Sequence, residues 1–545
     1  MGLHTIDYAI FLLYFLIVSG YGYWIYKRKQ SATLDSKEFF LAEGSLTWWA
    51  IGASLIASNI SAEQFIGMSG SGFAMGLAIA SYEWMAAATL IIVAVFFIPI
   101  YLKNKIYTMP QFLSQRYNNG VSTIMAVFWL LVYVFVNLSS ILYLGALAIV
   151  TITGIEFYTC MVGMAIFAIF ITLGGMKVIG YTDVIQVFVL VLGGLATTYL
   201  ALDLVSTQLG GTGVWDGLTM LHSEATDHFS MILSEGELMI PDGEGGTRDA
   251  YMDLPGLSVI IGSMWIINLS YWGCNQYITQ RALGADLQTA RSGLLFAAFL
   301  KLLMPIIVVL PGIAAYVLFQ NGLFQTEMTN ELGHVKPDHA YPVLLELLPI
   351  GLRGLSFAAL TAAIVASLAG KANSVSTIFT LDIYQKFFNK TASERKLVSV
   401  GRWAVVVSFV IAVLVAPQLR KLDQAFQYIQ EYTGFISPGV FAIFILGFFW
   451  KRTTSAAALT AAILTIPLST FLKFQFAEIP FINRMGIVFV VLAVLMVIIS
   501  LLDSKSKNNP KGLEIDASMF KPTTSFTVGS IIICGILAAL YTMFW

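Results

Sequence analysis

Residues 57–70 read ASNISAEQFIGMSG and interrupt a long apolar stretch. Four polar side chains fall within this short segment: Asn59, Ser61, Glu63 and Gln64. Unwound backbone inside a membrane is tolerated only where it is buried in protein or lines a cavity, because its amides and carbonyls need partners. A polar kink packed silently between helices is the alternative. The density of polar groups favours a broken helix beside a cavity.

The composition is that of an integral membrane protein. Apolar residues make up 58% of the 545 residues and charged residues only 11%, and the mean hydropathy is +0.80. A soluble domain has about a quarter charged residues. The net charge of −1 provides no broad basic surface for nucleic acid. The three cysteines indicate neither a disulfide framework nor a metal site.

Fourteen apolar stretches are long enough to cross about 30 Å of hydrocarbon. They lie at residues 8–26, 46–72, 77–102, 121–150, 155–173, 179–202, 256–276, 292–319, 354–380, 398–416, 424–449, 455–474, 484–502 and 525–544. Lys and Arg are concentrated in the loops that follow odd-numbered spans, so the positive-inside rule puts both chain ends outside. The acidic loop 203–255 then faces outward. We expect a multi-pass protein of a cell membrane, with a bacterial inner membrane favoured.

Two similar polar triplets occur five spans apart. Asn59-Ile60-Ser61 lies in the second span and Asn268-Leu269-Ser270 in the seventh. An odd offset makes two five-span units cross the membrane in opposite directions, as in transporters with inverted repeats and paired broken helices. We expect an all-α fold with discontinuous spans 2 and 7. Its segments are a peripheral first helix and cytoplasmic linker (1–45), a first repeat (46–202), an extracellular loop (203–255), a second repeat (256–450) and peripheral C-terminal helices (451–545).

Eight stretches distributed along the chain carry a family resemblance. They are ASNISAEQFIGMSG (57–70), ASYEWMAA (80–87), LGGMKVIGYTDVIQ (173–186), NLSYWGCNQYITQRALGA (268–285), FAAFLKL (296–302), FAALTAAIVASLA (357–369), NSVSTIFTLDIY (373–384) and FQYIQEYTGFISPG (426–439). At these residues the chain resembles the sodium:solute symporters, most closely the bacterial sodium/galactose symporters of the sodium/glucose cotransporter group. The resemblance implies a five-plus-five inverted-repeat core, alternating access, and one sugar site coupled to sodium.

Charged residues inside the membrane need a partner or a role, because each costs about 2.5–3.5 kcal/mol at the centre of a helix. Lys301 lies near mid-bilayer in the eighth span, where it either forms an ion pair or donates to a ligand oxygen. The resemblance implies sugar contacts for Lys301 and for Glu83, whose carboxylate accepts hydrogen bonds.

Amides and aromatic rings complete the sugar site that the resemblance implies. Amide side chains both donate and accept, as sugar hydroxyls do, and the matching ones are Gln64, Asn268 and Gln430. The rings of Tyr271 and Trp272 can cover the apolar face of a sugar.

Gates on both sides of this site follow from the same resemblance. Tyr271 matches the inner stacking gate, and Met68, Tyr82 and Phe426 match a hydrophobic outer gate, although from sequence alone these three pass as core. One departure is Ala86, where some sugar symporters have a serine, so one sugar hydrogen bond is lost and the preferred sugar is affected.

Three further polar residues are interpreted as structural. Adjacent helical residues point about 100° apart, so Glu63 faces away from Gln64 and stabilises the break, with Asn59 in a similar role. Glu431 is interpreted as a paired structural carboxylate.

The resemblance places a sodium ion between the break in span 2 and the middle of span 9. The ligands would be the carbonyls of Ala57, Ile60 and Ala363 and the hydroxyl of Ser367, which shares a helix face with Ala363. The family often has two successive serines here, whereas this chain has Ala366 before Ser367, so weaker sodium binding is expected. Sodium is favoured over protons because span 9 has no carboxylate.

Lys371 lies one turn beyond Ser367 on the cytoplasmic side, where ion pairing explains most lysines. Asp183, near the inner end of the sixth span, is a candidate partner. We predict that this pair borders the inward exit of sodium, with Asp183 guiding the ion out.

These patterns favour a secondary transporter in which sodium entry drives uptake of a monosaccharide, galactose or glucose. Sodium-coupled uptake of another polyol or neutral solute, such as inositol, is the alternative. The expected partners are the sugar and the lipid bilayer, with no nucleic acid and no organic cofactor. An enzyme is disfavoured because no nucleophile–base pair or intramembrane histidine occurs, and a sensor would add a soluble signalling domain. The preferred sugar, the sodium stoichiometry and the oligomeric state stay open.

Overall fold

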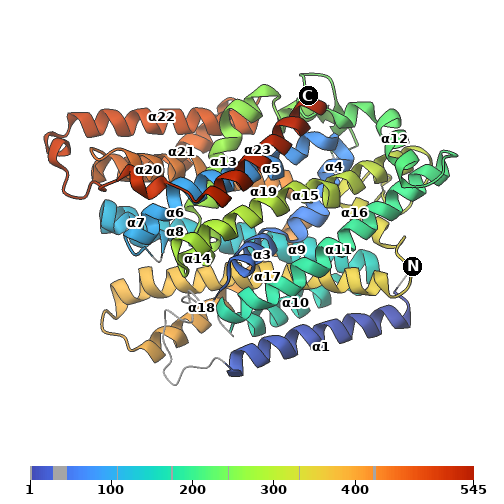
Figure 1. The fold of residues 1–545 in the computed structure, drawn as a ribbon, viewed down its shortest axis with the longest axis horizontal. Coiled ribbons are helices and arrows are strands. Elements are labelled where there is room, and N and C mark those ends of the chain that lie inside the picture. Colours follow the sequence, from blue (N-terminus) through green and yellow to red (C-terminus); the bar gives the residue numbers. More distant parts are fainter. Residues whose placement is uncertain are drawn as a thin grey trace.

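The computed structural model describes residues 3–28, 46–106, 108–173, 176–242, 245–330, 332–421 and 425–545. The described chain is largely helical, and its long helices lie side by side along the horizontal of Figure 1. The cytoplasmic linker that the sequence predicts before residue 46 lies outside the described residues from residue 29 onward.

Helices account for nearly all of the regular structure. The α-helices up to the acidic loop are α1 (Thr5–Arg28), α3 (Trp48–Asn59), α4 (Ser69–Met75), α5 (Ser81–Ile92), α6 (Ile98–Lys103), α7 (Met109–Arg116), α8 (Asn119–Leu131), α9 (Ser139–Thr153), α10 (Phe157–Thr172) and α11 (Met176–Gln208). Those that follow are α12 (Val214–Glu224), α13 (Met264–Cys274), α14 (Gln276–Leu283), α15 (Leu287–Gln320), α16 (Ala340–Leu345), α17 (Leu352–Thr377), α18 (Glu394–Val415), α19 (Ala425–Thr433), α20 (Ser437–Phe449), α21 (Ser455–Gln475), α22 (Phe481–Leu502) and α23 (Thr524–Met543).

Irregular helical turns interrupt several of these elements. Wider π-helical turns occur at η1 (Glu63–Met68), η3 (Val93–Phe97), η4 (Val132–Leu138), η7 (Val259–Ser263) and η9 (Ile378–Phe388). The 3₁₀ turns are η2 (Gly76–Ala80), η5 (Thr226–Phe229), η6 (Ala250–Met252), η8 (Pro337–His339), η10 (Ala416–Lys421), η11 (Ser504–Asn508) and η12 (Ala517–Phe520). Strands β1 (Met239–Pro241) and β2 (Thr247–Asp249) form a small antiparallel hairpin in the acidic loop, with Met239 opposite Asp249.

The prediction of an all-α, multi-pass membrane protein is confirmed. Ten helical segments among the described residues are long and apolar enough to cross a membrane, and three shorter apolar helices lie at Phe157–Thr172, Val259–Cys274 and Ser437–Phe449. The total of fourteen crossings stays a prediction, because segments such as α3, with 12 residues, are too short to span the hydrocarbon alone. The division into two repeats also stays a prediction.

The central and peripheral helices differ clearly in burial. In the segment that contains α17, 83% of the most apolar window is buried, compared with 22% in α1 and 17% in α23. The interior of the bundle is therefore formed around α17, α15 and the interrupted segment from α3 to α4, and these elements carry the candidate site.

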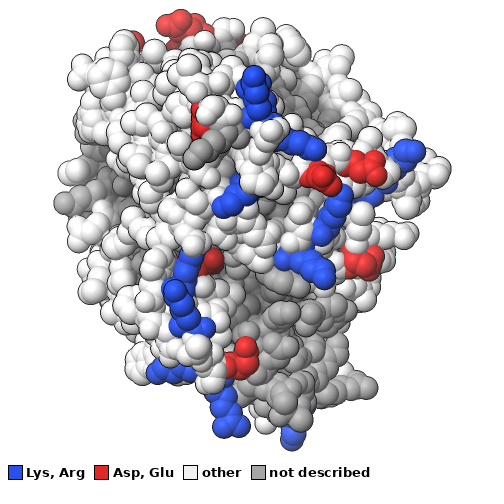
Figure 2. Space-filling view, turned by 90° about the vertical axis from the view of Figure 1, so that its left-hand side faces the viewer, with Lys and Arg blue, Asp and Glu red and all other residues white. Residues whose placement is uncertain are grey.

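Both chain ends and the acidic loop lie at one end of the bundle. Near the N-terminus, Asp7 Oδ1 accepts hydrogen bonds from the amides of Gly351 and Gly354 before and at the start of α17. Near the C-terminus, the Phe544 carbonyl accepts a hydrogen bond from the Met231 amide of the loop. The two termini and α12 are on the right-hand side of Figure 1, and Lys and Arg side chains are spread over the opposite end, shown in Figure 2. The end rich in Lys and Arg is the one that the positive-inside rule assigns to the cytoplasm, and this orientation stays a prediction.

A tight turn joins α4 to the following helices at Gly76. Its φ of 68° is a left-handed conformation that glycine adopts readily, and a Cβ at this position would lie 2.1 Å from the His228 carbonyl oxygen. The buried His228 ring donates from Nε2 to the Phe73 carbonyl at 3.1 Å and stacks on Tyr316 with centroids 4.0 Å apart. This part of the acidic loop is therefore packed directly onto the core.

Candidate functional site

The predicted break in span 2 is present. Helix α3 ends at Asn59, and Ile60 adopts an extended conformation with φ −73° and ψ 108°. The Ser61 amide donates to Gln64 Oε1 at 3.1 Å, whereas in a continuous helix it would bond to the Ala57 carbonyl. The Gln64 amide likewise donates to the Ser61 carbonyl at 3.1 Å. The break therefore removes the usual helical partners of the Ala57 and Ile60 carbonyls.

Span 7 is also interrupted, but the predicted position at residues 268–270 is wrong. Helix α13 runs through these residues, and the Asn268 side chain donates to the Met264 carbonyl of its own helix at 3.2 Å. The helix ends instead at Cys274, and Asn275, with φ −102° and ψ 124°, lies between α13 and α14 and accepts a hydrogen bond on its side chain from the Tyr277 amide. Asn is a favoured N-cap residue, so the pair Cys274-Asn275 was the signal that sequence reasoning missed. A further kink lies at Gly262.

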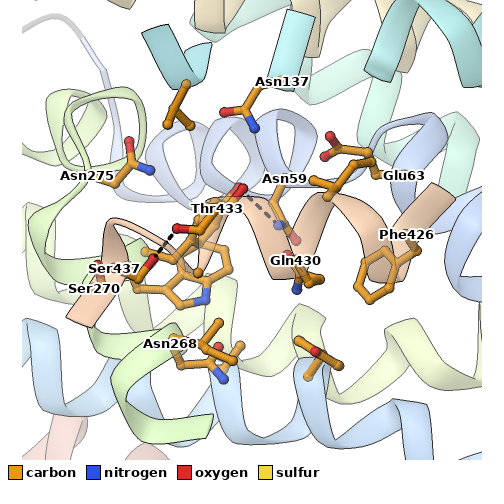
Figure 3. A pocket seen from close by; sticks show the side chains of 18 of the residues that line it. Asn59, Glu63, Asn137, Asn268, Ser270, Asn275, Phe426, Gln430, Thr433 and Ser437 are labelled. Carbon is orange, nitrogen blue, oxygen red and sulfur yellow. Dashed lines mark hydrogen bonds between the residues drawn. The ribbon is translucent and has the colours of Figure 1, made fainter. Parts of the chain in front are cut away.

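A cavity of about 100 Å³ lies beside the two interrupted spans. A single water needs roughly 10–15 Å³ of such space, so a small polar solute can be accommodated. The residues predicted for sugar contact or gating all line it: Gln64, Met68, Tyr82, Glu83, Asn268, Tyr271, Trp272, Lys301, Phe426 and Gln430. Figure 3 shows Asn59 of α3, Asn268 of α13, and Phe426 and Gln430 of α19 around this space.

Lys301 and Glu83 form a buried ion pair in the wall of the cavity. The side chains are 1% and 3% exposed, and Lys301 Nζ also donates to Asn59 Oδ1. Nζ lies 5.1 Å from the centroid of the Trp272 ring, within the range of a cation–π contact. An unpaired ammonium at this depth would be costly, so the pair stabilises both charges while they line the cavity.

The aromatic gate residues pack in two groups. Tyr82 and Phe426 meet edge to face, with centroids 5.2 Å apart and an interplanar angle of 87°, and Met68 is fully buried. Tyr271 and Trp272 are also edge to face at 5.2 Å. The structure thus brings each predicted pair of rings into contact at the cavity.

The residues predicted for sodium binding lie where span 2 is unwound and α17 passes it. Ser367 Oγ donates to the Ser58 carbonyl at 3.0 Å, which places this hydroxyl beside the break that exposes the carbonyls of Ala57 and Ile60. Ala363 is one turn earlier on α17 and is buried like Ser367.

The predicted pairing of Lys371 with Asp183 is wrong. Lys371 Nζ lies 3.2 Å from Glu63 Oε2, because α17 passes the π-helical turn that Glu63 begins. The other oxygen of Glu63 accepts from Ser140 Oγ at 3.0 Å. These two contacts agree with a supporting role for Glu63 at the break.

Asp183 belongs to a different buried cluster. Ser54 Oγ donates to Asp183 Oδ2 at 2.6 Å and accepts from Arg281 Nε at 2.9 Å, so one hydroxyl joins the carboxylate to the guanidinium. All three residues are almost fully buried.

Glu431 is a paired carboxylate, as the sequence predicts. It contacts Arg484 at 2.8 Å and Lys473 at 3.1 Å, both from the C-terminal helices. This cluster ties α19 to α21 and α22 rather than facing a ligand.

Several residues that line the cavity were not predicted. They are Trp129, Val132, Tyr133 and Asn137 of span 4, Asn275, Thr433, Ser437 and Met485 among others. Tyr133 and Asn137 are four residues apart in an otherwise apolar run, and a lone polar pair on one face of a membrane helix was the available signal.

Comparison with known proteins agrees with this architecture. The family model described as the sodium:solute symporter family matches residues 39–465. A sodium/glucose cotransporter of Vibrio parahaemolyticus is 48% identical over 552 residues, which covers 100% of this chain and 99% of that protein. Sodium/myo-inositol cotransporter 2 of Mus musculus is 36% identical and covers 87% of this chain and 71% of its own length.

A solved structure shares the fold. It is a Na⁺-coupled sialic acid symporter in a substrate-bound outward-open state, with a TM-score of 0.77, 21% identity, and coverage of 92% of this chain and 98% of that one. The chain therefore belongs to the sodium:solute symporter family, which makes it a sodium-coupled, multi-pass membrane transporter rather than an enzyme.

Proposed function

We propose that the protein is a symporter that couples sodium entry to uptake of a monosaccharide, galactose or glucose. The observation that carries the proposal is the cavity, because the ten side chains expected to bind or enclose a sugar converge on it from five separate spans. The high identity to a sodium/glucose cotransporter over the full length supports the same substrate class.

The cavity offers the chemistry that a sugar requires. Glu83 accepts hydrogen bonds and Lys301 donates them, while Gln64, Asn268 and Gln430 can do both. The Lys301–Glu83 pair satisfies these charges when no ligand is present, and a hydroxyl that accepts from one and donates to the other can take its place between them. A site with such groups rejects analogues that lack the hydroxyls, because its own polar atoms would be left without partners.

The rings supply the apolar part of the site. Tyr271 and Trp272 cover the apolar face of the sugar, and Tyr271 also acts as the inner gate. Met68, Tyr82 and Phe426 form the outer gate, supported by the edge-to-face packing of the last two rings.

Sodium binds at the break of span 2 in this proposal. The carbonyls of Ala57, Ile60 and Ala363 and the hydroxyl of Ser367 are its ligands, and Asp183 lies on its inward exit. A membrane potential of about 100 mV supplies about 2.3 kcal/mol per charge. One sodium ion per sugar therefore suffices to concentrate a neutral sugar tens-fold.

The test is uptake into proteoliposomes that contain the purified full-length chain. Labelled galactose, glucose and myo-inositol are supplied in parallel under an inward sodium gradient, an inward proton gradient, or no gradient. We expect accumulation of galactose or glucose above equilibrium with sodium alone. Accumulation driven equally by protons would overturn sodium coupling, and selective accumulation of myo-inositol would replace the sugar with the polyol alternative.

A further inference from the structure

We propose that the hydroxyl of Tyr277 is a positioning group that transmits occupancy of the sodium site to the sugar site. The inference rests on the proposed function. Tyr277 is the second residue of α14, directly after the break in span 7, and its side chain is fully buried. It belongs to neither set of proposed ligands, but it bonds to Tyr271 of the sugar site and to the Ser58 carbonyl, which also accepts from the proposed sodium ligand Ser367.

A continuous row of hydrogen bonds passes through this hydroxyl. Tyr277 donates to the Ser58 carbonyl and accepts from the Tyr271 hydroxyl at 3.2 Å. Tyr271 in turn accepts from Asn59 Nδ2 at 3.2 Å, the bond that ends on Asn59 in Figure 3. Asn59 Oδ1 accepts from Lys301, which pairs with the carboxylate of Glu83. The row therefore connects the polar wall of the sugar site to the last turn of α3, beside the break in span 2.

All the donors in this row point in one direction. Tyr277 has a single proton and gives it to a carbonyl that can only accept, so the Tyr271 proton must point to Tyr277. The Asn59 amide then donates to Tyr271, and the ammonium of Lys301 donates to Asn59. Hydrogen bonds arranged head to tail in a low-dielectric interior polarise one another. A change at the last acceptor, the Ser58 carbonyl, therefore alters the strength of the hydrogen bonds as far as Lys301 at the charged end of the row.

The last acceptor is also the point of contact with the sodium site. A carbonyl oxygen has two lone pairs, and the Ser58 carbonyl receives one hydrogen bond from Tyr277 and one from Ser367 Oγ. Ser367 is a proposed sodium ligand, and Ser58 lies between Ala57 and Ile60, whose carbonyls are two of the other three. An ion at these oxygens reorients the Ser367 hydroxyl and draws the same stretch of backbone toward it. Both effects alter the acceptor available to Tyr277.

The rest of the tyrosine is held in place independently of its hydroxyl. The Tyr277 amide donates to Asn275 Oδ1 at 3.3 Å, and Arg281 donates to the Tyr277 carbonyl. The Lys371 ammonium lies 5.3 Å from the centroid of the ring. Replacement by phenylalanine keeps these contacts and removes only the link in the row, so Tyr277→Phe is a selective test.

The experiment measures coupling in proteoliposomes with the labelled sugar that the wild type transports best, galactose or glucose. The apparent KM for the sugar is determined at low and at saturating sodium, and the ratio of the two values defines the coupling. Linkage requires the sugar to change the affinity for sodium by the same factor. The sodium concentration for half-maximal uptake is therefore also measured, at low and at saturating sugar. In Tyr277→Phe we expect the coupling ratio to fall roughly 2- to 10-fold, the range that loss of one net hydrogen bond produces.

Tyr101→Phe is the matched control. Tyr101 is buried, and its hydroxyl donates at 2.7 Å to the Gly273 carbonyl of α13. The variant therefore also loses one hydrogen bond from a tyrosine hydroxyl to span 7, but this bond is not part of the row. We expect its coupling ratio to equal that of the wild type. Tyr271→Phe interrupts the row one bond away, and in the double variant with Tyr277→Phe the losses should be less than additive, because one row is broken twice.

The outcomes separate the two proposals. A wild type whose uptake does not depend on sodium overturns the proposed function. A sodium-dependent wild type with an unchanged coupling ratio in Tyr277→Phe overturns only the role of Tyr277, as does an equal loss in Tyr101→Phe or full additivity in the double variant. If Tyr277→Phe does not fold, the coupling ratio of Tyr271→Phe is the deciding measurement. A wild-type ratio in this variant refutes the proposal that the row of hydrogen bonds couples the two sites.

Discussion

The buried pair of Glu63 and Lys371 can be tested by removing each charge singly and then both together. The two side chains are 11% and 3% exposed and their charged atoms are 3.2 Å apart. Two unit charges at this distance attract by about 5 kcal/mol at an effective dielectric constant of about 20. Removing one partner leaves the other charge buried, which costs about 3–5 kcal/mol. We therefore expect Glu63→Gln to lower the free energy of unfolding by an amount in this range.

The complementary variants make this prediction specific. Lys371→Met should lose less, because the Ser140 hydroxyl still donates to Glu63 at 3.0 Å. The double variant Glu63→Gln/Lys371→Met removes both charges at similar volume and should lie within about 1 kcal/mol of the wild type. Asp183→Asn provides the control, because Asp183 contacts Ser54 and not Lys371.

The assay is thermal unfolding of the detergent-solubilised full chain in sodium-free buffer, followed by the fluorescence of its 11 tryptophans. Sodium is left out because a bound ligand stabilises the native state by mass action. Both single variants should melt below the wild type, and the double variant should recover. Single variants as stable as the wild type would refute the assignment, and so would recovery of Lys371→Met by Asp183→Asn instead of by Glu63→Gln.

Three further predictions concern transport. Gln64→Ala and Lys301→Ala should each raise the sugar KM by 10-fold or more, because a hydrogen bond that involves a charged or buried partner contributes about 1.5–3 kcal/mol. Sodium-driven uptake at the wild-type KM in both variants would contradict the assignment of these residues to the sugar site. Ala366→Ser restores a hydroxyl beside Ser367 and should lower the sodium concentration for half-maximal uptake, whereas an unchanged or higher value would argue against a sodium ligand at this position. Asp183→Asn should slow sodium release, measured as efflux of labelled sodium from proteoliposomes, and an unchanged release rate would show that Asp183 is not on the exit path.

Helix interruption in span 2 is predictable from the sequence because several polar side chains occur together there. The structure adds the reason, since Ser61 and Gln64 exchange hydrogen bonds that replace those of the helix. The position in span 7 is harder to predict. An Asn can satisfy its side chain on its own helix, as Asn268 does, or cap the next one, as Asn275 does, and both choices are locally stable.

The partner of a buried charge cannot be predicted from the spacing of residues along the sequence alone. The distance of Lys371 from Ser367 along α17 fixes its depth, but the partner depends on the rotation of α17 relative to its neighbours, and that rotation brings it to Glu63. The same limit explains the omission of Tyr133 and Asn137, because the face that a span presents to a cavity depends on how it packs. Family resemblance predicted which side chains line the cavity, because it already contains this packing information.

The packing of His228 against Gly76 affects how movements of the transporter can be observed. The His228 backbone approaches Gly76 too closely for a methyl group to fit, and its ring stacks on Tyr316 of α15. We therefore expect this portion of the loop to move together with the adjoining ends of α4 and α15. A fluorophore or spin label on the exposed surface of α12, in the same loop, would thus report movements of the helices on which the loop packs. Distances measured from such a label are then expected to follow the opening and closing of the core without any label being introduced inside the membrane.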